Sequence, residues 1–205
     1  MSATATPTLT DRTELPHVLM SGAKLGALTA GWVVLYLVIW RYVPGTAGGL
    51  LNSVVVLLGG LSMALLPAQW TGARHTEGIA GAAGVGLFST VVFSAIDIIV
   101  LRPAHAYPWT WDAIGGNSTW WYLPVWWQFG TFVSWMGAML TAGQNSKGTA
   151  NLTSLALPLV VGAVVIGGLA HFMGLGFTAM YPVAIGLGFS VILTVLGVAA
   201  IARKA

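Results

Sequence analysis

The sequence predicts an all-α integral membrane protein, a bundle of about six transmembrane helices with the N- and C-termini in the cytoplasm. The first observation is composition: 57% of the 205 residues are hydrophobic and 6% are charged, and the mean hydropathy is +0.84. A soluble domain carries about 25% charged residues. Eight basic and five acidic residues cannot coat a soluble particle of this size, so most of the surface must face lipid.

The second observation is the length of the apolar segments. About 20 helical residues cross the hydrocarbon core of a bilayer, and six segments are that long. A polar segment, residues 1–24, precedes them; it lacks the pattern of a cleavable signal, and we expect it to be cytoplasmic or interfacial. Residues 25–205 are then one transmembrane domain. The expected spans, in chain order, are about 25–43, 48–66, 79–101, 120–142, 152–173 and 178–202.

Helix breakers and charged pairs give these bounds, because proline cannot continue the hydrogen bonding of a helix and charges stay near water. They are Pro44-Gly45 after the first span, Pro67 after the second, Arg102-Pro103 after the third, the turn GQNSKGTAN after the fourth and Arg203-Lys204 after the sixth. Before the third span, Thr76 and Glu77 suit a helix cap and first turn.

The third observation is the distribution of positive charge. With the N-terminus inside and six spans, the inner side holds Arg12, Lys24, Arg74, Lys147, Arg203 and Lys204. The outer side keeps only Arg41 and Arg102. This asymmetry follows the positive-inside rule. We expect the protein to lie in the cell (inner or cytoplasmic) membrane. The cations form no basic run, so the net charge of +3 does not indicate a nucleic-acid partner.

Residues 102–130 hold six of the ten tryptophans, and residues 102–119 form the longest connection, an aromatic outer loop. Tryptophan and tyrosine favour the membrane interface, so we expect an aromatic belt there. Trp126 and Trp127 lie about 9 Å deeper than Trp120 on a helix, and adjacent residues point about 100° apart. At least one of them should face another helix. With Gln128 and Trp135 they form a candidate pocket or contact face.

Asp97 lies inside the outer end of the third span, and Arg102 follows five positions later. Two interpretations stay open: a locally satisfied ion pair, or a proton or ligand site, since ionisable residues in a membrane often serve function. His105 and Asp112 in the outer loop and His171 near the outer end of the fifth span lie on the same side. Imidazole and carboxylate groups suit a metal ion, and His171 could also ligate a haem or chlorophyll.

Three functional hypotheses follow. The first is a membrane subunit of a larger complex, with redox, oxygenase and photosynthetic complexes as the candidates. It would pack against other subunits or itself through glycine-rich helices and its outer aromatic face. The second is a small transporter or channel with a site around Asp97, Trp126 and Gln128. The third is a metal-dependent enzyme that uses Asp97, His105, Asp112 and His171. Cysteine is absent and no GxSxG, P-loop or HExxH motif is present, which favours a protein that is not catalytic by itself.

Overall fold

The described part of the chain is entirely helical. The computed structural model describes residues 11–107, 122–148, 151–175 and 180–203, and these residues contain no strand. The helices are α1 (Leu15–Tyr42), α2 (Gly45–Trp70), α3 (Thr76–Ile96), the π-helix η1 (Asp97–Leu101) that continues α3, α5 (Tyr122–Ser146), α6 (Leu152–Phe172) and α7 (Tyr181–Ala202). The all-α prediction is confirmed for these residues.

Five helical segments are long and apolar enough to cross a membrane: α1, α2, α3 with η1, α6 and α7. Their outward faces carry many large hydrophobic side chains, as a lipid-facing surface does. The chain is therefore a multi-pass membrane protein by length and composition. The predicted fourth span corresponds to α5, which is 25 residues long but does not meet the same criterion of hydropathy. Polar residues such as Gln128, Gln144 and Asn145 lower its hydropathy.

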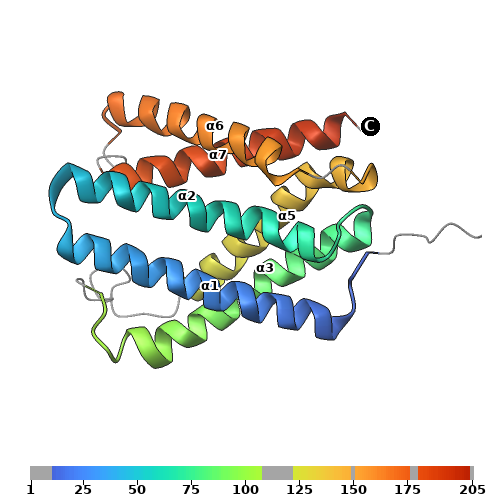
Figure 1. Cartoon of the computed structure of the whole chain (residues 1–205), viewed down its shortest axis with the longest axis horizontal. Coiled ribbons are helices and arrows are strands. Elements are labelled where there is room, and N and C mark those ends of the chain that lie inside the picture. The colour runs from blue at the N-terminus through green and yellow to red at the C-terminus, as the bar shows by residue number, and fades with distance from the viewer. Residues whose placement is uncertain (1–10, 108–121, 149–150, 176–179, 204–205) are drawn as a thin grey trace, which may run out of the picture.

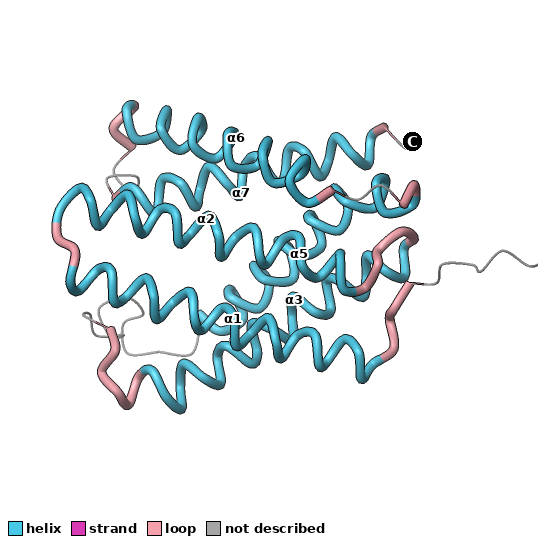
Figure 2. Tube along the Cα trace, viewed as in Figure 1, coloured by secondary structure: helices cyan, strands magenta, loops and turns pink. Residues whose placement is uncertain are grey.

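Figure 1 shows the helices running roughly along the long axis of the molecule, with α1 and α2 side by side in front and α6 and α7 paired at one edge. The α3 helix packs mainly on α1 and α5, and α5 packs on α3, α2 and α7. The more polar α5 therefore lies in the middle of the bundle, where neighbouring helices cover much of it. Figure 2 shows the connecting turns at the two ends of the bundle, and α1 begins at the end where α7 finishes.

Several predicted helix bounds differ from the structure, and the two that involve prolines show why. The α1 helix begins at Leu15, ten residues before the predicted span, because Pro16 occupies the first turn, where no intrahelical N–H is required. The α2 helix begins at Gly45 and continues past Pro67 to Trp70. Pro67 has no N–H to donate to the Met63 carbonyl oxygen four residues earlier, and the Ser134 hydroxyl of α5 donates to that oxygen instead at 2.9 Å.

Small residues let the helix backbones approach closely. A Cβ atom on Gly137 of α5 would collide with the carbonyl oxygen of Ala64 on α2, and one on Gly167 of α6 would collide with that of Ala184 on α7. In lipid such close packing is a main source of helix association. The larger buried cluster lies where α2, α5, α6 and α7 meet, and comprises Ala64, Leu65, Val133, Met136, Leu155, Leu159, Ala163, Phe189 and Leu193.

Candidate functional site

Asp97 occupies the first position of η1 and is 2% exposed. In this wider turn the N–H of Arg102 donates to the carbonyl oxygen of Asp97 at 2.9 Å, a five-residue step. Turns of this kind are rare in helices and are frequent at functional sites. The turn directs Asp97 into the bundle, while Ile99 and Val100 are exposed on the surface of the bundle. Among the described residues, Asp97 is the one acidic group at this end of the bundle, and it is buried.

Two side chains satisfy the Asp97 carboxylate. Arg102 Nε donates to Oδ2 at 3.0 Å, and the Tyr107 hydroxyl donates a short hydrogen bond to Oδ1. Burial raises the pKa of Tyr107 well above its usual value, and the neighbouring Asp97 carboxylate, which accepts its proton, raises the pKa further. Tyr107 therefore stays protonated and keeps donating. Of the two interpretations of Asp97, this geometry matches the locally satisfied ion pair, with a tyrosine added.

Trp126 and Trp127 face different surroundings. Trp127 Nε1 donates to Ser94 Oγ on α3 at 3.3 Å, and Ser94 Oγ in turn donates to the carbonyl oxygen of Thr90 at 2.7 Å. Trp126 is exposed and makes an edge-to-face contact with Phe129, with ring centroids 6.4 Å apart. The expectation that one of the two indoles faces another helix is thus met by Trp127, which joins α5 to α3 one turn below Asp97.

Gln128 and Trp135 are exposed, like Trp126. We use the name α5 outer face for five exposed side chains of this helix: Val125, Trp126, Gln128, Phe129 and Trp135. The residues predicted as a pocket or contact face therefore divide into Trp127, which contacts α3, and an outward aromatic surface that contains one amide.

The predicted ligand residues do not come together in the described part of the chain. His105 is exposed in the turn after η1, with a φ of 49°. His171 lies at the end of α6 against Tyr181 of α7, with ring centroids 4.8 Å apart. The α6 helix packs on α7 and α2, whereas Asp97 continues α3. Among the described residues no three His, Cys, Asp or Glu side chains could hold one metal ion, and Asp112 lies outside them.

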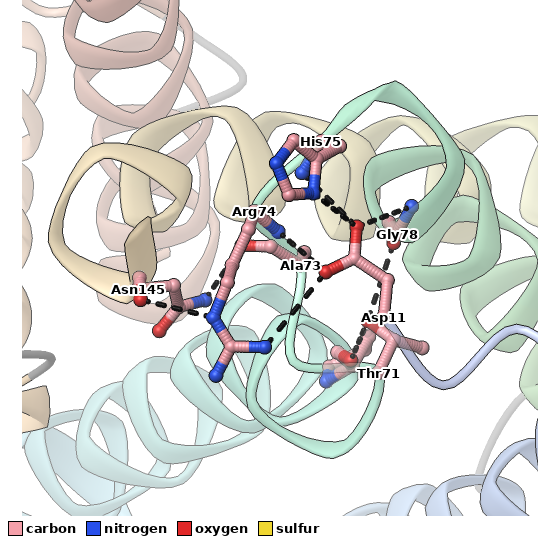
Figure 3. Close-up of polar contacts among 8 residues, drawn as sticks. Asp11, Thr71, Ala73, Arg74, His75, Gly78 and Asn145 are labelled. Atoms are coloured by element: carbon pink, nitrogen blue, oxygen red, sulfur yellow. Dashed lines mark hydrogen bonds and ion pairs between the residues drawn. The ribbon is translucent and has the colours of Figure 1, made fainter. Parts of the chain in front are cut away.

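A polar junction at the opposite end of the bundle is centred on Asp11 (Figure 3). Its side chain is 4% exposed and accepts three backbone N–H groups, from Arg74 at 3.2 Å, His75 at 3.0 Å and Gly78 at 3.1 Å. These amides lie at the start of α3, whose N-cap residue, His75, makes no cap hydrogen bond with its own side chain. The predicted local cap at Thr76 is therefore replaced by a carboxylate from the N-terminal segment.

Arg74 links this junction to α5. Its Nη1 lies 3.9 Å from Asp11 Oδ1, and its Nε donates to the carbonyl oxygen of Asn145 at 3.1 Å. The Asn145 amide donates to the carbonyl oxygen of Ala73 at 2.8 Å. Figure 3 shows these groups closing around the loop between α2 and α3. Because these groups are satisfied by partners within the chain, we assign the junction to stability.

A groove of about 340 Å³ lies where α1 ends and where α2 and α7 begin. Asn52 of α2 lines it and is 2% exposed, yet its Oδ1 has no hydrogen-bond partner among the described residues. Sequence analysis did not single out Asn52. The sequence did contain a signal for Asn52, because an amide inside the apolar segment 48–66 needs a hydrogen-bond partner, as a carboxylate there does.

Comparisons with family models, with curated proteins and with solved structures find no match for this chain. The functional argument therefore rests on the geometry of its own residues.

Proposed function

We propose that this protein is a membrane-embedded, non-catalytic subunit of a larger assembly, and that it binds its partner through the α5 outer face. The observation that carries the proposal is Gln128, an exposed amide about 9 Å along the helix from Tyr122, among exposed aromatic rings. An amide that faces hydrocarbon without a hydrogen-bond partner is costly. A polar group on a partner helix would supply that bond and would remove this cost.

The composition of the α5 outer face supports a protein partner. Trp126, Phe129 and Trp135 are 45%, 44% and 40% exposed, and large aromatic side chains dominate the binding energy of many interfaces. Among the long helices of the described chain, α5 is also the least apolar. A helix of this composition is better suited to protein than to lipid on both faces.

Gentle extraction from the native membrane tests this proposal. We expect a particle larger than one chain that contains other membrane proteins, and the doubly substituted variant Gln128→Leu, Trp135→Ala should run as a smaller particle. The matched control is Phe172→Ala, which removes an 89% exposed ring from α6 and should leave the particle intact. A particle that holds only copies of this chain would indicate self-association. A lone, stable monomer would contradict the proposal.

The absorbance and metal content of the same particle would define its class. A coloured or metal-bearing particle would favour the redox, oxygenase or photosynthetic complexes that the sequence suggests. Transport through a site around Asp97 has less support, because Arg102 and Tyr107 already bond both carboxylate oxygens, and Trp126 and Gln128 are exposed. A metal-dependent enzyme has the least support, because no cluster of metal ligands forms among the described residues and His171 lies against α7.

A further inference from the structure

Gln128 places a polar group on the α5 outer face at a depth where lipid tails are expected. The preceding residue, Trp127, donates from its indole to Ser94 Oγ on α3 at 3.3 Å, which fixes the level of Gln128 along the bundle. Ser94 lies seven residues before the end of the apolar segment Thr76–Leu101. Gln128 therefore lies about 10 Å inside the end of this span. It makes no hydrogen bond within the described part of the chain.

Gln128 and Trp135 lie on one exposed stripe of α5. Seven residues are about two helical turns, so the two side chains point in nearly the same direction. Val125 lies one turn from Gln128 towards the start of the helix and is 53% exposed. In Figure 1, α5 lies behind α1 and α2, and it packs on α2, α3 and α7, so the stripe faces away from the rest of the bundle. A helix from another molecule can therefore lie along it.

The amide of Gln128 is complementary to a second amide of the same kind. Its NH2 group donates and its carbonyl oxygen accepts, so two such amides form two hydrogen bonds with each other. An ammonium only donates and an ionised carboxylate only accepts, so either of them would need a different group on its partner. None of the five side chains of the α5 outer face is charged, so two copies of this face bring no like charges together.

A second copy of the chain also supplies the amide at the matching depth. Copies of one chain insert into a membrane in the same orientation, so a twofold axis that relates two of them runs along the membrane normal. Each residue then lies at the same depth in both copies. Gln128 of one copy meets Gln128 of the other where the axis passes beside the stripe, whereas an unrelated helix would need a polar residue at that depth.

We propose that the partner at the α5 outer face is a second copy of this chain. The two α5 helices lie side by side across a twofold axis along the membrane normal. The two Gln128 amides hydrogen-bond to each other, and Trp135 of each copy packs against α5 of the other. The inference rests on the proposed function, because it names the partner at the same face; further subunits of the assembly bind elsewhere on the pair.

Cross-linking in the native membrane tests this pairing, because the chain has no cysteine and each introduced cysteine is unique. Val125→Cys places a thiol one turn from Gln128 and leaves the amide in place. We expect a short bismaleimide to join two copies of this variant. The matched control is Val165→Cys on α6, which replaces a side chain of the same type with the same exposure of 53% and should yield little dimer.

Gln128→Leu tests the amide pair in the purified full chain, reconstituted in vesicles and labelled at the N-terminus. Energy transfer between labelled copies, measured as the vesicles are diluted with lipid, gives the strength of self-association. We expect Gln128→Leu to weaken it about tenfold, the loss expected for two interhelical hydrogen bonds. Gln128→Asn keeps an amide and should weaken it less. The side chain is exposed, so neither substitution should alter the fold.

The outcomes separate this inference from the proposed function. If Val125→Cys is joined to a different protein and not to itself, the second copy is excluded, while the proposed function is supported. No cross-link, together with a lone monomer on extraction, would contradict both. Equal amounts of dimer from Val125→Cys and Val165→Cys would indicate random collision and would overturn the inference. Equal self-association of the wild type and Gln128→Leu would overturn the assignment of the amide pair.

Discussion

The carboxylate of Asp11 accepts the backbone N–H of Gly78 at 3.1 Å, although 67 residues separate the two in the chain. Asp11 therefore acts as the N-cap of α3 from outside that helix. A negative charge near the first turn also suits the helix dipole. The contact fixes the N-terminal segment against the loop between α2 and α3, and a second bond, from Arg12 N–H to the Thr71 carbonyl oxygen at 2.8 Å, reinforces it.

We expect Asp11→Ala to lower the free energy of unfolding by about 2 kcal/mol, because three backbone amides lose their acceptor. Thermal unfolding in detergent measures this. Glu14→Ala is the control, since Glu14 is an exposed acidic residue at the start of α1 that makes no cap hydrogen bond. Equal stability of the two variants would show that Asp11 does not cap α3.

Alanine substitutions at two glycines of α5 should change the free energy of unfolding in opposite directions. Gly137→Ala places a methyl group against the backbone of Ala64, so α2 and α5 must separate, and we expect a loss of about 2 kcal/mol. A methyl group at Gly143 would meet no atom within 4 Å, so Gly143→Ala should gain about 0.5–1 kcal/mol from its higher helix propensity. Unfolding of both variants in the same detergent compares them. A similar response from both would argue against close contact of α2 and α5.

The all-helical class and five of the spans followed from the sequence because apolar length and charge placement are strong, local signals. The bounds were less accurate where proline was taken as a break. Pro67 lies inside α2, where the Ser134 hydroxyl of α5 serves the Met63 carbonyl oxygen that proline cannot. The sequence near a proline does not reveal that a side chain from another helix replaces its missing N–H.

The candidate site was predicted in part. Asp97 and Arg102 lie five positions apart, so their ion pair was within reach of sequence reasoning, whereas the π-helix that turns Asp97 inward was not. Asp11 gave no local signal, because its partners follow it by 63 to 67 residues. A shared outer side was too coarse a criterion for predicting that His105 and His171 lie together. One end of a bundle includes side chains from helices that pack against different neighbours.

Replacing Tyr107 by phenylalanine should change how stability depends on alkaline pH. The pKa of Tyr107 is raised in the folded protein by burial and by the Asp97 carboxylate, above the value of about 10 for an unfolded chain. The folded state therefore binds this proton more tightly. Its contribution is complete below about pH 10 and declines as the pH rises above that value.

Thermal unfolding of wild type and Tyr107→Phe between about pH 8 and pH 11 measures the difference between them. We expect the wild type to lose more stability across this range, so that the two curves converge at high pH. Both proteins share the other titrating groups, so the effect of those groups cancels in the difference between the two curves. Parallel curves would mean that Tyr107 does not donate to a buried carboxylate.

Asp97 and Arg102 should behave as a coupled pair. Asp97→Asn removes the charge that Arg102 faces at 3.0 Å and leaves a largely buried guanidinium, which is 18% exposed, with a weaker acceptor. We expect a loss of about 2 kcal/mol, less than for a fully buried pair because Arg102 can reach toward the interface. Arg102→Gln should cost a similar amount, since it leaves a buried carboxylate with Tyr107 alone.

The double variant Asp97→Asn, Arg102→Gln decides between a structural pair and a transport site. If the pair is structural, the double variant should be at least about 1 kcal/mol more stable than the sum of the single losses implies, because neither charge is left alone. Unfolding of all four proteins in one detergent gives this coupling energy. Additive losses would mean that the two charges do not stabilise each other, and a site at Asp97 that serves transport would then become the better interpretation.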